Sequence, residues 1–299
     1  MSAKPHVGLI GVGLMGHGIA ANILKNGYPL SFLDHPGNQP VADLVAQGAV
    51  ARASGAELAA QCDIVLLCVT GTPQVEDALF RPEGVLAGMK PGTIVIDCST
   101  AIPASTRAIA ARIVAAGGRF LDAAMTRTPK EAAEGRLNLI VGGPDELLRD
   151  VLPLLRSFAE NITHAGPAGA GHQLKLLHNF VSLGFSAVLA EAGAAARRAG
   201  VPAGVFAEVL GKGGGGGVIL ERMKPFLLAD DASGFTFTLS NALKDLTYYT
   251  AMTQELGAAS GVAQAARALY ADAVGQGHEA RPIPELIAIL ADGGASRPG

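Results

Sequence analysis

The chain has 299 residues, of which 49% are hydrophobic and 16% charged, and its formal net charge at pH 7 is -3. This length and composition indicate a globular protein with a large core, built as two domains or as one domain with a large helical extension. Basic residues are not clustered, which argues against nucleic acid as the main partner.

The first half of the chain alternates short apolar runs with Ala-rich helical segments. We predict strands at residues 6–11, 30–34, 63–69, 93–98, 119–122, 137–143 and 162–166. Apolar strands that are buried on both faces and alternate with helices indicate a parallel, doubly wound sheet. We therefore place an α/β domain at residues 1–165.

The second half of the chain contains helical patterns only. Residues 172–200 predict one long helix that ends at Gly200 and Pro202. Shorter helices are predicted at about 203–211, 217–228, 240–257, 259–275 and 283–291. We place an all-helical domain at 166–293 and a tail at 294–299. The glycine run at 211–217 is either a flexible connector between two helices or a mobile loop near a pocket.

The sequence predicts neither a membrane span nor a metal site. The three cysteines, Cys62, Cys68 and Cys98, lack metal-ligand spacing, and the last two lie in apolar runs that favour buried, reduced thiols. Glycines interrupt the first apolar segment at once, which is not typical of a signal peptide. The longest apolar stretch contains Lys175 and Glu191 and predicts a buried helix. We expect a cytoplasmic protein.

A glycine-rich motif, Gly11-x-Gly13-x-x-Gly16, follows the first predicted strand and opens a helix. The first glycine permits a tight turn, the second lets the backbone approach a pyrophosphate, and the third lets helix and strand pack closely. The helix N-terminus offers N–H groups and a positive dipole to the phosphates. We predict that this loop binds a dinucleotide through Gly11, Val12, Gly13, Leu14, Met15 and Gly16.

Asp34 bears on the choice of cofactor. It ends the second predicted strand, 23 residues after Gly11, where an acid binds the adenosine ribose hydroxyls. A carboxylate there repels a 2′-phosphate, and residues 35–38 offer no arginine to counter it. NAD is therefore favoured over NADP, although a protonated His35 would soften that preference.

Two further strands end in residues that suit ligand binding. Val69 and Thr70 follow one strand at the sheet edge where ligands bind, either as an ordinary loop or in backbone contact with the cofactor. Ser99 and Thr100 follow the next strand. Their hydroxyls either cap the following helix or donate to a carboxylate and to the nicotinamide ribose.

Lysine and asparagine lie one turn apart near the start of the long helix. Lys175 and Asn179 are at i and i+4, on one helix face, among apolar neighbours. Lys175 is either a snorkelling side chain or a partly desolvated general acid/base that exchanges a proton with a carbonyl oxygen held by Asn179. Lys244, beside Asp245, is either half of a surface ion pair or a contact to the cofactor or to an anionic substrate.

Five segments together resemble the β-hydroxyacid dehydrogenase family over nearly the whole chain. They are "GLIGVGLMGHGIAANIL", "DCSTAIP", "FLDAAMTRT…EGRLNLIVGG", "GAGHQLKLLHNF" and "ALKDL". The resemblance implies a Rossmann domain, a helical domain built on the long interdomain helix, and homodimers or homotetramers through the helical half. It also implies roles for five residues: catalytic Lys175 with its partner Asn179, substrate-binding Ser99, cofactor-binding Thr100, and Lys244 at the cofactor or substrate edge.

The chain departs from the family pattern at Thr126-Arg127-Thr128, where most members have Ser-Gly-Gly, and at Ala124, where the usual residue is proline. An arginine at this position is a feature in which the chain resembles the sulfolactaldehyde reductase branch, where the matching residue is expected to bind a sulfonate. Arg127 is then either a guanidinium fork for a carboxylate or sulfonate, or a solvated loop charge.

These observations predict an NAD-dependent, 3-hydroxyisobutyrate dehydrogenase-like oxidoreductase. It would interconvert a short β-hydroxy acid, or a sulfonate analogue, and its semialdehyde, with Lys175 as general acid/base. The acid end of the substrate would be held by Ser99, Arg127 and one helix turn that contains His178, Phe180, Val181 and Ser182. A sulfolactaldehyde- or 4-hydroxybutyrate-type aldehyde reductase is the alternative.

Three more distant functions are disfavoured. Imine reduction needs no lysine of this kind as proton donor. A decarboxylating sugar-acid dehydrogenase usually has a larger helical domain than this chain can provide. A non-catalytic NAD-binding scaffold would have lost Lys175 or Asn179, and both are present.

Overall fold

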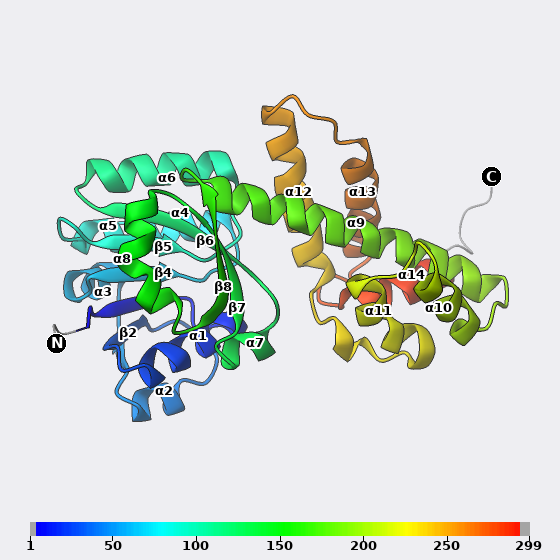
Figure 1. The fold of residues 1–299 in the computed structure, drawn as a ribbon, viewed down its shortest axis with the longest axis horizontal. Coiled ribbons are helices and arrows are strands. Elements are labelled where there is room, and N and C mark those ends of the chain that lie inside the picture. The colour runs from blue at the N-terminus through cyan, green and yellow to red at the C-terminus, as the bar shows by residue number, and fades with distance from the viewer. Residues whose placement is uncertain (1–3, 294–299) are drawn as a thin grey trace. The chain divides into compact units, whose positions relative to one another are not determined.

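A computed structural model describes residues 4–293 of the chain (Figure 1). The chain divides into two compact units, Met1–Lys175 and Leu176–Gly299. The division falls inside the long helix α9 (Ala170–Arg198), whose first turn packs on the sheet of the first unit. The predicted domain boundary at residue 165 lies just before this helix.

The first unit is built on one eight-stranded sheet with the order β3-β2-β1-β4-β5-β6-β7-β8. Its strands are β1 (Val7–Ile10), β2 (Leu30–Leu33), β3 (Val50–Arg52), β4 (Ile64–Leu67), β5 (Ile94–Asp97), β6 (Arg119–Thr126), β7 (Leu137–Gly142) and β8 (Ala159–Gly166). The mostly parallel, doubly wound Rossmann-type sheet predicted from the alternating pattern is confirmed.

The sheet differs from the prediction in three respects. Strand β7 is antiparallel to β6, because the chain reverses through a short helix after Thr126 instead of crossing over the sheet. Strand β3 was not predicted, since it has only three residues, none of them buried, and therefore carries no apolar run. Strand β6 also extends beyond the predicted end at residue 122.

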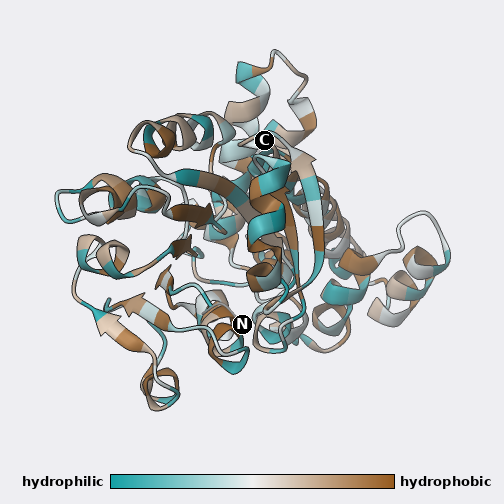
Figure 2. Cartoon of the chain, turned by 60° about the vertical axis from the view of Figure 1, so that its left-hand side comes forward, coloured by the Kyte–Doolittle hydropathy of each residue, from teal (hydrophilic) through white to brown (hydrophobic). Residues whose placement is uncertain are grey.

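Helices cover both faces of this sheet. They are α1 (Leu14–Lys25), α2 (Ala42–Ala46), α3 (Gly55–Gln61), α4 (Thr72–Phe80), α5 (Val85–Gly88), α6 (Pro103–Ala115), α7 (Pro129–Ala133) and α8 (Asp145–Leu155). Along β4, Ile64 and Leu66 enter the core beneath α1 and α8, whereas Val65 and Leu67 enter the core beneath α3, α4 and α6. Apolar side chains of β4 therefore alternate between two cores, and this strand is apolar along its whole length. Figure 2 shows hydrophobic residues along the inner strands of the sheet.

The second unit contains the rest of α9 and further helices. These are α10 (Ala203–Lys212), α11 (Val218–Ala229), α12 (Leu239–Glu255), α13 (Gly261–Gly275) and α14 (Leu286–Gly293), with 3-10 turns at Ala232–Gly234 and Ile283–Glu285. Their core surrounds Tyr270, whose hydroxyl donates to the carbonyl oxygen of Leu183 at 3.0 Å. The glycine run connects α10 to α11. Residues 294–299 lie outside the described part of the chain.

Among the described helices, α9 alone is long and apolar enough to cross a bilayer by length and composition. Half of its most apolar window is buried inside the molecule, as is also usual for the core helix of a soluble protein. We therefore assign α9 to the protein core.

Candidate active site

The glycine loop between β1 and α1 has the geometry of a dinucleotide cradle. Gly11 has φ +98°, and a Cβ there would lie 2.2 Å from the carbonyl oxygen of Cys68. A Cβ on Gly16 would lie 1.9 Å from the carbonyl oxygen of Gly11, so helix and turn are in direct backbone contact. At Gly13 a Cβ would meet no protein atom within 4 Å, and no side chain caps the helix. The loop thus leaves room for a pyrophosphate at the helix N-terminus.

The segment after β2 is attached to this loop. The backbone N–H of Gln39 donates to the carbonyl oxygen of Val12 at 2.7 Å, and the Asn38 side chain donates to the carbonyl oxygen of Leu33. The Asp34 carboxylate is exposed at the end of β2, where a ribose can reach it. His35 accepts a hydrogen bond at Nδ1 from the backbone N–H of Gly37 at 2.9 Å.

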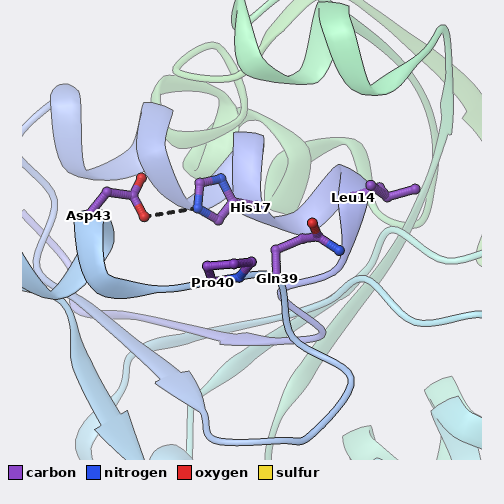
Figure 3. A pocket seen from close by; sticks show the side chains of 5 residues that line it. All are labelled: Leu14, His17, Gln39, Pro40 and Asp43. Carbon is purple, nitrogen blue, oxygen red and sulfur yellow. Dashed lines mark hydrogen bonds and ion pairs between the residues drawn. The ribbon is translucent and has the colours of Figure 1, made fainter.

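A hollow of about 300 Å³ lies beside the N-terminus of α1 (Figure 3). It is lined by Leu14, His17, Gln39, Pro40 and Asp43, and His17 Nε2 lies 3.1 Å from an Asp43 oxygen. The glycine loop and the open space beside it fit a bound dinucleotide.

Two loops at the carboxyl edge of the sheet are hydrogen-bonded to each other. The backbone N–H of Val69 donates to Ser99 Oγ at 3.0 Å, and Ser99 itself is almost fully buried. Thr70 is exposed and Thr100 is half-buried. The following helix α6 has no side-chain cap, so the helix-cap alternative for Ser99 and Thr100 is wrong.

Arg127 follows β6 directly, with φ 81°, a conformation that favours glycine. Its guanidinium binds the Glu160 carboxylate on β8 and the carbonyl oxygen of Arg136. The hydrogen bond from Arg127 lowers the pKa of Glu160, so this ion pair persists at neutral pH. The Arg127 guanidinium is therefore partly exposed and paired with a carboxylate of the protein itself, and its role in holding an anionic ligand stays a prediction.

The first turns of α9 present three of the predicted residues on one face. Lys175, Asn179 and Ser182 are spaced i, i+4 and i+7. Lys175 is half-buried and Asn179 is buried. The exposed His178 lies next to them, with Nδ1 2.9 Å from Asn179 Oδ1.

Two other predicted substrate-binding residues, Phe180 and Val181, lie away from that face. The ring of Phe180 stacks on Tyr249, with centroids 4.3 Å apart, and Val181 is 68% exposed. The structure does not bring them together with Lys175, since neither shares its i, i+4, i+7 stripe.

Asp245 on α12 is a site residue that the sequence did not single out. It is buried, and its two oxygens bind different partners: Asn179 Nδ2 at 2.6 Å and Lys244 Nζ at 2.7 Å. The pair Lys244–Asp245 is therefore not a surface pair. The sequence does contain a signal for Asp245: it lies three residues after Ala242 and four before Tyr249, so it shares the apolar face of the helix with them.

Within residues 4–293, no group of three His, Cys, Asp or Glu side chains is placed to hold a metal ion. Burial raises the pKa of the Cys62 thiol to about 11, which keeps it protonated and poorly nucleophilic. The polar groups available for chemistry are thus those around the glycine loop, at the strand ends and on α9 and α12.

Comparison with known protein families covers both units. Residues 6–166 match the NAD binding domain of 6-phosphogluconate dehydrogenase. Residues 169–290 match the family described as NAD-binding of NADP-dependent 3-hydroxyisobutyrate dehydrogenase. The matched segments include the glycine loop in the first case and the lysine-bearing helix in the second.

Individual relatives resemble the chain over most of its length. The NAD-dependent L-serine dehydrogenase of Pseudomonas aeruginosa is 36% identical over 74% of this chain and 74% of its own. The 3-sulfolactaldehyde reductase of Escherichia coli is 29% identical over 91% and 92%. The crystal structure of a 3-hydroxyisobutyrate dehydrogenase from Salmonella typhimurium has a TM-score of 0.83 and 30% identity, covering 95% of this chain and 99% of the other.

Proposed function

We propose that this chain interconverts a short β-hydroxy acid and its semialdehyde. The chain belongs to the β-hydroxyacid dehydrogenase family and is an NAD(P)-dependent oxidoreductase acting on CH–OH groups. The observation that carries the proposal is the helix face that presents Lys175 and Asn179, the latter held by the buried Asp245. We further propose that NAD is the cofactor and that the protein acts in the cytoplasm as a homodimer or homotetramer.

Lys175 is the proposed general acid/base. When bound, the nicotinamide cofactor supplies the hydride in reduction and accepts it in oxidation. During reduction the Lys175 ammonium donates a proton to the substrate's carbonyl oxygen, and during oxidation the amine takes it back. Asn179 orients the same oxygen, and the hydrogen bond to Asp245 restricts its side chain to one rotamer.

The acid end of the substrate is assigned to Ser99 and Arg127, with His178 and Ser182 beside Lys175 on the helix. The guanidinium of Arg127 now holds Glu160, so an incoming carboxylate or sulfonate takes the place of that side chain. The roles of Phe180 and Val181 in substrate binding stay predictions.

The proposed cofactor contacts are based on the glycine loop between β1 and α1. The loop from Gly11 to Gly16 faces the pyrophosphate and Asp34 accepts from the adenosine ribose hydroxyls. Val69, Thr70 and Thr100 are assigned to the cofactor at the strand ends, and Lys244 to its edge.

A sulfonate substrate is the second candidate. Arg127 favours it, because a guanidinium fork binds sulfonate oxygens through two hydrogen bonds, and a 3-sulfolactaldehyde reductase is among the relatives. The two candidates differ in the acid group alone. Initial rates with NADH and a panel of C3–C5 semialdehydes that end in carboxylate, sulfonate or phosphate will separate them.

Lys175→Ala tests the proposed chemistry. We expect turnover to fall by about 10²–10⁴-fold, because the proton donor is lost, while the Kd for NADH stays within about twofold. The measurements are steady-state kinetics with the best aldehyde of the panel and NADH fluorescence titration. Lys25→Ala, an exposed lysine at the end of α1, is the matched control and should keep wild-type turnover. Near-normal turnover in the Lys175 variant would remove the lysine mechanism.

A further inference from the structure

Two buried carboxylates lie side by side beneath the start of α9. Asp97 ends β5, Asp122 is on β6, and the two residues are paired in register. Both side chains are fully buried. Buried carboxylates are costly unless they are hydrogen-bonded, so their partners show what they stabilise.

Asp122 anchors the first turn of α9. Its Oδ1 accepts from the backbone N–H of Gly169 at 2.7 Å, and its Oδ2 accepts from the backbone N–H of His172 at 2.8 Å. These are N–H groups that lack partners within the helix, and the carboxylate also meets the positive end of the helix dipole. Asp122 is thereby satisfied.

Asp97 has a different set of partners. Its Oδ1 accepts from the backbone N–H of Ser99 at 2.9 Å. Its Oδ2 has no hydrogen bond and faces His172 Nε2, which also has none, at 3.9 Å. Burial raises the pKa of Asp97, and the neighbouring His172 opposes that rise.

The histidine continues the chain of polar contacts. His172 Nδ1 lies 2.8 Å from Thr106 Oγ1, and both residues are fully buried. The Thr106 hydroxyl donates to the carbonyl oxygen of Ile102 at 3.1 Å, so at the contact with His172 the ring Nδ1–H donates to Thr106 Oγ1. Nε2 is the ring atom nearest Asp97. Thr106, His172 and Asp97 then form one buried polar chain from α6 through α9 to β5.

We propose that Asp97 and His172 are a positioning pair for the reaction. The Asp97 carboxylate fixes the positions of two proposed site residues. It accepts from the backbone N–H of Ser99, and it faces His172, which lies three residues before Lys175 on the same helix. The inference rests on the proposed function, because it requires Lys175 to be the general acid/base whose position matters for turnover.

His172 is the member of the pair to replace, since it precedes Lys175 on α9 and is not among the residues assigned to the cofactor. Asp97, by contrast, is hydrogen-bonded to Ser99, which is next to the cofactor-assigned Thr100. A displacement of about 1 Å of a catalytic group can lower turnover about 10²-fold. Loss of the pair should therefore lower kcat and leave the Kd for NADH unchanged.

The test compares two replacements of one residue. His172→Leu removes the polar contacts, and we expect kcat to fall about 10–100-fold, with NADH Kd within about twofold. His172→Gln keeps a polar side chain with both an amide N–H donor for Thr106 and a second polar atom beside Asp97, so kcat should recover to within about threefold of wild type. The substrate is the best aldehyde of the panel used for Lys175→Ala, and kcat is expressed per NADH-binding site.

A second variant, and a second measurement on the two His172 variants, test the pair without relying on kcat of those variants. Thr106→Val keeps the shape of the side chain and removes the hydroxyl, and should lower kcat about 3–10-fold. Hydrogen exchange of the amides at 169–175 should accelerate at least about tenfold in His172→Leu and less in His172→Gln. Ser157→Ala, which removes another buried hydroxyl in the first unit, is the control with unchanged kcat.

The outcomes distinguish a failure of the positioning pair from a failure of the proposed function. An inactive Lys175→Ala together with wild-type kcat and exchange in His172→Leu would overturn the positioning pair alone. Equal losses in the Leu and Gln variants would also overturn it, because they would indicate a packing role only. An active Lys175→Ala would instead overturn the proposed function.

Discussion

Arg127 shows how one residue departs from its local context. Its positive φ costs an L-residue about 1–2 kcal/mol, which glycine avoids. Its ion pair with Glu160 is partly exposed, since the two side chains are 25% and 46% accessible, and such pairs contribute about 0–1 kcal/mol. Stability alone therefore does not account for an arginine at this position, and the role that we propose for it is binding of the acid group of the substrate.

Arg127→Gly is predicted to raise KM for an anionic semialdehyde about 10–100-fold, because a charge-assisted hydrogen-bonded pair is lost. KM for an uncharged aldehyde of similar size should change little, and the thermal midpoint should not fall, since glycine relieves the backbone. Steady-state kinetics and a thermal melt measure these quantities. Glu160→Gln, which releases the guanidinium, is the opposing control and should lower KM. Equal KM rises for both aldehydes would return Arg127 to a purely structural role.

Asp34 determines the expected cofactor preference. Its exposed carboxylate repels a 2′-phosphate by an amount worth about tenfold in kcat/KM, and residues 35–38 contain no arginine to offset that repulsion. We expect NADH to be used more efficiently than NADPH by about that factor. Asp34→Asn, which keeps the shape and removes the charge, should reduce the preference. A tenfold preference for NADPH in the wild type would contradict the assignment.

Among the elements, the start of α9 is fixed by close backbone packing against the sheet. Gly142 on β7 and Gly171 in α9 are in backbone contact: a Cβ on Gly142 would lie 2.8 Å from the nitrogen of Gly171, and a Cβ on Gly171 would lie 2.4 Å from the carbonyl oxygen of Ile140. The missing side chains make room for the Asp122 carboxylate. The helix that bears Lys175 is thus joined to the strand ends by close backbone packing.

Gly171→Ala tests this packing. The added methyl group must displace backbone, so the free energy of unfolding should fall by about 1–3 kcal/mol and kcat should fall with it. Denaturant titration and kinetics are the measurements. Gly204→Ala in α10, where a Cβ meets no atom within 4 Å, is the matched control and should be neutral or stabilising. An unchanged Gly171→Ala would show that α9 can move away from the sheet without loss.

At the scale of the whole molecule, much of the fold was predictable because its signals are local. The alternation of apolar strands and helices, the end of the long helix at Gly200 and the five later helical segments all follow from short-range periodicity. The antiparallel β7 and the three-residue β3 were not predictable, since strand direction and edge pairing depend on how the chain is routed through space.

The glycine loop, the carboxylate after β2 and the spacing of Lys175 and Asn179 can be predicted from the sequence, because each is a pattern among near neighbours whose geometry the backbone period sets. The pairing of Arg127 with Glu160, 33 residues away, and of Asn179 with Asp245, 66 residues away, depends instead on the folded structure. The folded structure alone also places His172 beside Asp97. Such partners are brought together by the packing of separate elements, and no local pattern in the sequence records which buried acid will meet which donor.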